Sequence, residues 1–166
     1  HSLNINVIRG SENDLLARFL KALSNYPAEC VVRVTADNPF TDPRLLDAAI
    51  ELFRKAKCDY VHVPDAPIGT TADVFSAESL TLSHQNADSQ YEREHINAHI
   101  LNNPNFFNIK QLSVPKNLQR SDIEFTIDTE AQLESLNDFN WQDLNLFEID
   151  TATLIKLYDE RAFLKS

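Results

Sequence analysis

The sequence predicts an α/β domain with three layers, α/β/α, in which helices cover both faces of a mostly parallel sheet. Short runs of β-branched and apolar residues alternate with stretches whose apolar residues recur at helical spacing. The run at 30–35 is almost wholly apolar, which is typical of a strand with both faces covered. A length of 166 residues with 43% hydrophobic side chains is enough for one domain with a real core.

The first half of the chain alternates strands and helices. Strands are expected at 3–8, 30–35 and 59–63. Ser11 is expected to cap the helix that follows the first strand. Asp42 followed by Pro43 predicts the start of the next helix, because proline fits the first helical position.

The second half is less regular, but its boundaries carry clear signals. Strands are expected at 73–76, 107–114 and 123–127, and helices at 78–85, 92–102, 130–136 and 151–163. Pro104 ends one helix, since the residue before a proline avoids the helical region. Thr129 and Gln132 fit a capping box, and Asp150 is placed to cap the last helix.

Composition excludes several classes of function. With 15 basic and 25 acidic residues the net charge is -10, which repels nucleic-acid backbones and anionic membranes. We find no apolar run of the roughly 20 residues that a membrane span needs and no signal peptide, so we expect a cytoplasmic protein. Cys30 and Cys58 are expected to be reduced thiols, and the two glycines form no phosphate-binding loop.

Two aspartates follow predicted strands directly. Asp37 comes after 30–35 and Asp128 after 123–127. In open α/β sheets ligands bind outside the carboxyl ends of the strands, and two carboxylates there could share Mg²⁺, which takes its other ligands from water and phosphate. The alternative is that each aspartate only forms a turn or caps a helix.

Five segments carry a family resemblance, in the family's own order. Residues 31–43 resemble V-R-x-T-G-D-x-P-L-x-D-P, and 9–19 resemble F-R-G-S-x-x-D-V-L-x-R-Y. Residues 69–75 are similar to G-x-D-x-E-V-F, 93–95 to R-E-H, and 126–130 to the start of T-x-D-T-P-E-D-L. These patterns belong to the sugar-acid cytidylyltransferases, particularly the spore-coat-polysaccharide type.

The resemblance implies a glycosyltransferase-A-like nucleotidyltransferase fold and a Mg²⁺-dependent activity. The enzyme would join a nucleoside monophosphate from CTP to a sugar or sugar acid and release pyrophosphate, for surface-polysaccharide biosynthesis. The two metal-binding aspartates of the family fall on Asp37 and Asp128, the pair that their position after strands also selects.

The chain departs from the family pattern in two ways. Nothing in it resembles the A-R-x-x-S-x-R-L-P-G-K loop that holds the triphosphate, and the chain contains no methionine. We therefore expect residues 1–166 to be a single partial domain that lacks its N-terminal nucleotide-binding unit and is inactive alone. Thr71 and Asp73, which align with the family's sugar contacts, replace an aspartate and a glutamate.

Further candidates for substrate binding carry charge or can titrate. Arg33 lies in an apolar strand and needs either a carboxylate partner or a bound anion. Arg93, Glu94 and His95 are candidates through the R-E-H match, with a surface or capping role as the alternative. His95 and His99 could form a metal pair, but no third ligand at suitable spacing supports one.

Two broader questions stay open from the sequence. A non-catalytic binding or assembly module derived from this fold is the alternative to an enzyme. A homodimer could form through Phe106, Phe107, Trp141 and Phe147, which could equally be core residues.

Overall fold

One sheet organises the structure, a computed structural model that describes residues 5–137 and 149–164. The strands are β1 (Cys30–Arg33), β2 (Tyr60–His62), β3 (Asp73–Ser76) and β4 (Ile109–Gln111). Their order across the sheet is β1-β3-β2-β4. β3 runs antiparallel to β1 and β2, whereas β4 is parallel to β2, so three strands share one direction in a mixed sheet.

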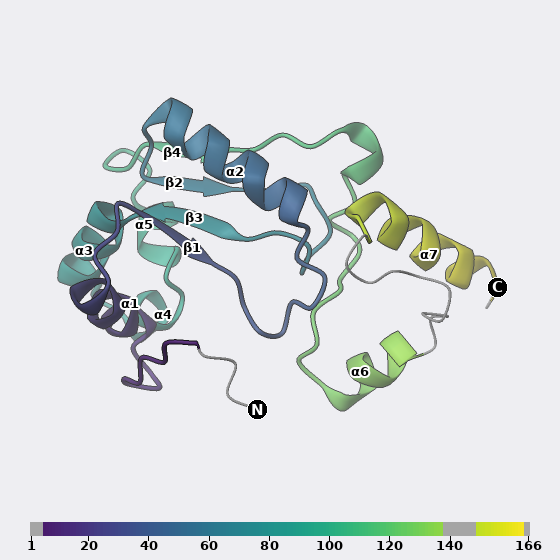
Figure 1. Cartoon of the computed structure of the whole chain (residues 1–166), viewed down its shortest axis with the longest axis horizontal. Coiled ribbons are helices and arrows are strands. Elements are labelled where there is room, and N and C mark those ends of the chain that lie inside the picture. The colour runs from purple at the N-terminus through teal and green to yellow at the C-terminus, as the bar shows by residue number, and fades with distance from the viewer. Residues whose placement is uncertain (1–4, 138–148, 165–166) are drawn as a thin grey trace.

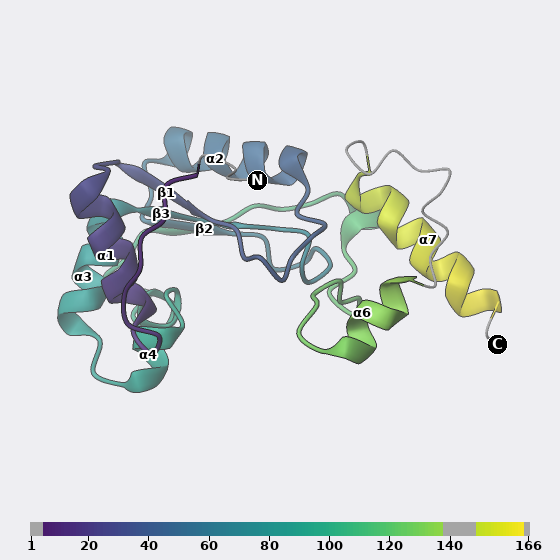
Figure 2. The ribbon, with the colours of Figure 1, turned by 60° about the horizontal axis from the view of Figure 1, so that its bottom comes forward.

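Helices cover both faces of this sheet. They are α1 (Leu15–Asn25), α2 (Pro43–Ala56), α3 (Ala77–Asn86), α4 (Gln90–Glu94), α5 (Ala98–Asn102), α6 (Glu130–Asn137) and α7 (Thr151–Leu164), with a 3-10 turn η1 at Lys116–Leu118. α2 lies on one face, and α1, α3, α4 and α5 lie on the other (Figures 1 and 2). The expected three-layer α/β/α class is confirmed. None of the described helices is long and apolar enough to cross a membrane.

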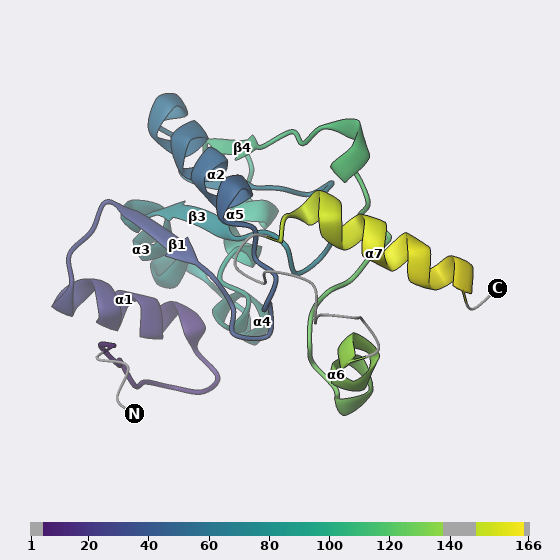
Figure 3. The same ribbon diagram turned by 45° about the vertical axis from the view of Figure 1, so that its right-hand side comes forward.

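Alternate side chains of the strands pack into two separate hydrophobic clusters, one on each face of the sheet. Val61 and Val74 pack with Ala49 and Phe53 on the α2 side. On the other side the buried cluster comprises Leu16, Tyr60, Phe75, Leu80, Ala87, Ile96, Ile100 and Phe107. α6 and α7 lie beyond one end of the sheet, away from α1 (Figures 1 and 3).

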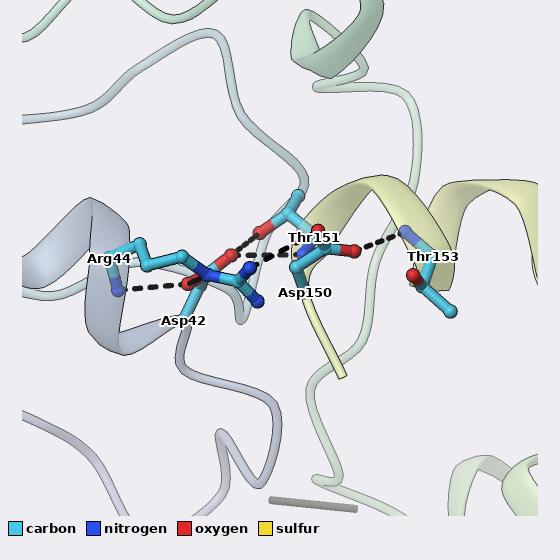
Figure 4. Close-up of polar contacts among 5 residues, drawn as sticks. All are labelled: Asp42, Arg44, Asp150, Thr151 and Thr153. Atoms are coloured by element: carbon cyan, nitrogen blue, oxygen red, sulfur yellow. Dashed lines mark hydrogen bonds and ion pairs between the residues drawn. The ribbon is translucent and has the colours of Figure 1, made fainter. Parts of the chain in front are cut away.

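Asp42 joins this distant part of the chain to the sheet domain. It caps α2 by accepting a hydrogen bond from the Arg44 N–H at 2.9 Å, with Pro43 at the first position as predicted. Its other carboxylate oxygen accepts from the backbone N–H and the hydroxyl of Thr151, each at 2.9 Å (Figure 4). Asp150 accepts from the Thr153 N–H at 2.8 Å, so the predicted cap of α7 is also confirmed.

The first predicted strand is wrong where the structure describes it. Residues 5–8 form no strand, and the side chains of Ile5 and Val7 are 68% and 70% exposed. The cap of α1 is Asp14 rather than Ser11, because the Asp14 carboxylate accepts from the Ala17 N–H at 2.8 Å.

Two further elements differ for tertiary reasons. The helix expected at 92–102 is split into α4 and α5, and Asn97 at the break donates to the Tyr60 hydroxyl at 3.3 Å. The strand expected at 123–127 is only an isolated bridge to Ile68. Its buried residues pack against α7 instead of the sheet, in a cluster of Ile123, Phe125, Leu154 and Ile155.

The edge position of β1 explains a third difference. All four of its side chains are half-buried, although an apolar run had predicted burial on both faces. β1 pairs with β3 alone among the described strands, which leaves its other edge uncovered. The capping box of α6 is confirmed, since the Gln132 side chain accepts from the Thr129 N–H at 2.9 Å and Thr129 Oγ1 from the Gln132 N–H at 3.3 Å.

Candidate functional site

A cavity of about 220 Å³ opens where β1 and β2 end. Its polar lining comes from Arg33, Thr35 and Asn38 after β1 and from Thr71 and Asp73 at the start of β3. Because β3 is antiparallel, its first residue lies at the carboxyl ends of its neighbours. The cavity therefore occupies the place where open α/β sheets bind their ligands.

Asp73 is the centre of the polar network in the cavity wall. Its carboxylate accepts from the Tyr60 hydroxyl at 2.6 Å and from the Arg33 guanidinium at 3.3 Å. Arg33 is the direct partner of Asp73 in the pairing of β1 with β3. Burial, followed by the negative charge of Asp73, raises the pKa of Tyr60 well above its usual value, so the phenol stays a neutral donor.

The two candidate metal ligands lie on adjoining backbone. The Ile127 N–H donates to the Asp37 carbonyl at 2.9 Å, which places Asp128 beside Asp37 although 91 positions separate them in sequence (128 − 37). Both aspartate side chains are exposed. Asn38, the residue after Asp37, lines the cavity, whereas neither aspartate belongs to the lining.

The carboxylate oxygens of Asp37 and Asp128 are the type of ligand that a hard divalent cation prefers. Within residues 5–137 and 149–164 no group of three or more acidic, histidine or cysteine residues could hold a metal ion. Mg²⁺ does not need such a group, because it keeps waters and substrate phosphates as most of its ligands. Asp37 and Asp128 would supply the carboxylate oxygens.

Gly69 permits the close contact between the cavity loop and the segment that leads to Asp128. Its φ is +88°, and a Cβ atom there would lie 2.9 Å from the Phe125 carbonyl carbon. The Ile68 N–H donates to the Ile123 carbonyl at 2.9 Å, and the Phe125 N–H donates back to Ile68 at 2.8 Å. Only a residue without a side chain fits this position.

Arg93, Glu94 and His95 lie outside the lining of the cavity. Arg93 pairs with Asp14 at 3.2 Å, which ties α4 to α1. The Glu94 carboxylate accepts from the Gln90 side chain at 3.2 Å, and the His95 ring packs on the Tyr91 ring at 4.3 Å. These contacts agree with the surface or capping role that the sequence left open for Arg93, Glu94 and His95.

The other histidines have separate environments. His99 pairs with Glu92 at 3.1 Å rather than with His95, so the described contacts give no support to a histidine metal pair. His62 stacks on Tyr60 with ring centroids 5.2 Å apart, and burial lowers its pKa. His62 is therefore neutral near pH 7.

The structure adds residues that sequence reasoning missed. Tyr60, Asn97 and Asn38 belong to the cavity wall or to the network behind it. Tyr60 lies in an apolar strand and Asn97 within an expected helix, so no local pattern distinguishes either of them. Asn38 could have been selected from the sequence, because it immediately follows the candidate ligand Asp37.

The aromatic residues considered for a dimer surface differ in exposure. Phe106 is 84% exposed, whereas Phe107 is 8% exposed and belongs to the core under α1 and α3. Trp141 and Phe147 lie outside the described residues.

Comparison with known proteins gives consistent matches. Residues 1–159 match the model of a family described as cytidylyltransferase. An uncharacterized protein of Methanocaldococcus jannaschii is 34% identical over 166 residues, which are 100% of this chain and 68% of that protein. The spore coat polysaccharide biosynthesis protein SpsF of Bacillus subtilis is 34% identical over 131 residues, 78% of this chain and 55% of SpsF.

A solved structure supports the same grouping. The structure of a cytidylyltransferase from Leptospira borgpetersenii superposes with a TM-score of 0.85 at 27% identity. The match covers 96% of this chain and 68% of that one.

Proposed function

The chain belongs to the cytidylyltransferase family, and on that premise we propose that the protein transfers cytidine monophosphate from CTP to a sugar or sugar acid. Pyrophosphate is the second product. SpsF is named for spore coat polysaccharide biosynthesis, and we extend that role here to the making of an activated sugar for a surface polysaccharide. Because the chain spans 55% to 68% of these relatives, the activity is proposed for the whole protein.

The observation that carries this proposal is the neighbouring position of the cavity and the aspartate pair. The backbone hydrogen bond from Ile127 to Asp37 sets Asp128 next to Asp37, and Asn38, the residue after Asp37, lines the cavity; this proximity supports the proposal. In the proposed reaction a sugar hydroxyl oxygen attacks the α-phosphorus of CTP and forms a new P–O bond. The bond from that phosphorus to the bridging oxygen breaks, pyrophosphate leaves, and the hydroxyl proton passes to solvent.

The residues divide into two roles. Asp37 and Asp128 would hold Mg²⁺, which when bound neutralises charge on the phosphate oxygens. Arg33, Thr71 and Asp73 line the cavity and would contact the sugar. A protein of net charge -10 repels a free triphosphate, so a cation held by the two aspartates favours nucleotide binding.

The test is an assay of pyrophosphate release by the intact protein, with CTP, Mg²⁺ and a panel of sugars and sugar acids. Asp37→Asn should abolish turnover and weaken Mn²⁺ binding by about tenfold or more, followed by electron paramagnetic resonance, because one charged ligand is lost. Asp47→Asn is the matched control, since Asp47 is an exposed aspartate on α2.

The outcomes separate the two candidate classes of function. Normal turnover in Asp37→Asn would contradict the metal role of Asp37. An intact protein that binds sugar but releases no pyrophosphate with any member of the panel would favour the non-catalytic module. A homodimer, a cytoplasmic location and a separate nucleotide-binding segment stay predictions.

A further inference from the structure

We propose that Tyr60 and Asn97 are positioning residues, which hold the Asp73 carboxylate in place as the acceptor for a hydroxyl group of the sugar. This inference rests on the proposed function, because it takes the cavity as the sugar site. It goes further by giving a role in substrate binding to two residues that do not themselves line the cavity.

The carboxylate of Asp73 has acceptor capacity that the described residues do not use. An ionised carboxylate can accept about four hydrogen bonds. One oxygen of Asp73 accepts from the Tyr60 hydroxyl at 2.6 Å, and the other accepts from the Arg33 guanidinium at 3.3 Å. Asp73 lines the cavity and its side chain is 19% exposed, so acceptor capacity remains for a donor that enters the cavity.

Tyr60 fixes this carboxylate more firmly than Arg33 does. The Tyr60 side chain is 1% exposed and stacks on Phe75, with ring centroids 4.8 Å apart, so the core sets the position of its hydroxyl. The 2.6 Å separation is typical of a hydrogen bond from a hydroxyl to an ionised acceptor. Arg33 is a longer side chain, 31% exposed, and its contact is 0.7 Å longer (3.3 − 2.6).

Asn97 supports the Tyr60 hydroxyl from behind. Its side-chain amide donates to the hydroxyl oxygen at 3.3 Å, and the hydroxyl donates onward to Asp73. Hydrogen bonds in such a chain polarise one another, so the first donor strengthens the second contact. Asn97 lies at the break between α4 and α5, and its neighbours Ile96 and Ala98 are buried, which anchors the break in the core.

The alternative is that Asp73 only satisfies the buried hydroxyl of Tyr60 and does not contact substrate. The two roles differ in what Tyr60 influences. A positioning residue changes sugar binding through Asp73, so its effect disappears when Asp73 is absent. A structural residue changes stability and leaves the affinity for one particular substrate alone.

A double-mutant cycle in the intact protein tests the inference. Pyrophosphate release is measured with CTP, Mg²⁺ and the panel of sugars and sugar acids, and binding of each panel member without CTP is followed by saturation-transfer NMR. Tyr60→Phe should raise the KM and the Kd for the sugar about tenfold and change the KM for CTP by less than about twofold. In the Asp73→Ala background, Tyr60→Phe should change sugar binding by less than about twofold.

Control variants separate this effect from a loss of stability. Phe53→Leu removes core volume in the cluster on the α2 face, away from the cavity lining, so it should lower stability but keep sugar binding within about twofold. Should Tyr60→Phe fail to fold, Asn97→Ala tests the same chain of donors and should raise the Kd for the sugar about threefold. Asn105→Ala, at an exposed asparagine, is its matched control.

The outcomes distinguish the inference from the proposed function. Unchanged sugar binding in Tyr60→Phe, an equal loss in the Asp73→Ala background, or an equal rise in the KM for CTP would overturn the inference. A wild-type protein that binds no member of the panel would also overturn it. Sugar binding that weakens as expected, in a protein that releases no pyrophosphate, would instead overturn the proposed function and leave the positioning role standing.

Discussion

Removal of the Asp42 side chain should detach α7 from the sheet domain. The carboxylate is 4% exposed and accepts three hydrogen bonds at 2.9 Å, one from the Arg44 N–H and two from Thr151 (Figure 4). Thr151 is fully buried, so Asp42→Ala leaves its N–H and its hydroxyl without a partner and without water. We expect Asp42→Ala to leave the sheet folded and to loosen the contact between α2 and α7.

The magnitude follows from the groups that lose their partner. Loss of a helix cap costs about 1 kcal/mol. Each of the two stranded groups of Thr151 adds about 1 to 3 kcal/mol when it stays buried. Fraying of α7 would let water reach Thr151 and reduce that cost, so we expect a loss of about 4 kcal/mol in the free energy of unfolding.

Urea unfolding and amide hydrogen exchange measure this prediction. The amides of Leu154 and Ile155 on α7 should lose protection in Asp42→Ala, while those of β3 keep it. Asp47→Ala on the exposed face of α2 is the control and should change stability by less than about 0.5 kcal/mol. A loss below about 1 kcal/mol with α7 still protected would refute the reasoning.

The same contact predicts a dependence on pH. Burial alone would raise the pKa of Asp42, but the hydrogen bonds from Thr151 and Arg44 outweigh it and leave the pKa below its usual value. A lowered folded pKa means that the carboxylate stabilises the fold above the unfolded pKa of about 3.9 and loses that effect as the pH falls through the folded pKa. The free energy of unfolding should therefore decrease on acidification below about pH 4 and do so less in Asp42→Asn.

Two other substitutions test the cavity. Gly69→Ala should lower stability by about 2 kcal/mol in urea unfolding, since φ is +88° and the new Cβ would press on the Phe125 backbone. Gly10→Ala is the comparison: its Cβ would meet the Arg18 side chain at 2.7 Å and no backbone atom, and no positive φ adds strain there. Gly10→Ala should therefore cost less than Gly69→Ala, and equal losses would contradict this account. Tyr60→Phe keeps the buried ring but removes one hydrogen-bond donor to Asp73. We expect the free energy of unfolding to fall by about 1 to 2 kcal/mol, with an unchanged far-ultraviolet circular dichroism spectrum. An unchanged urea midpoint would show that the 2.6 Å hydrogen bond contributes nothing to stability.

Local signals explain the parts of the fold that the sequence predicted. The helix starts at α2, α6 and α7 were predicted from residues that hydrogen-bond within about one helical turn. These residues are Asp42, which precedes Pro43, the pair Thr129 and Gln132, and Asp150. Such interactions depend on spacing along the chain and not on the rest of the fold. The three-layer class followed for a similar reason, since alternation of strand and helix patterns is itself a sequence property.

Errors arose where a local pattern had more than one tertiary solution. The alternating residues Ile123 and Phe125 predicted a strand, but they bury their side chains against α7 and keep only one bridge to Ile68. The helical pattern of 92–102 is interrupted between Glu94 and Ala98, where Asn97 donates to the Tyr60 hydroxyl. Periodicity records that a side chain is buried and leaves open which element covers it.

The sequence by itself determined the caps of α2, α6 and α7, the alternation of strands and helices over residues 30–62, and the candidacy of Asp37 and Asp128 as residues that follow apolar runs. Only the tertiary structure decided that Asp37 and Asp128 adjoin, through the hydrogen bond from the Ile127 N–H to the Asp37 carbonyl. It also decided that Arg33 forms an ion pair with Asp73. Arg93, equally plausible in sequence, pairs with Asp14 away from the cavity. Pairing between residues 40 or more positions apart depends on sheet order, and neither periodicity nor spacing encodes that order.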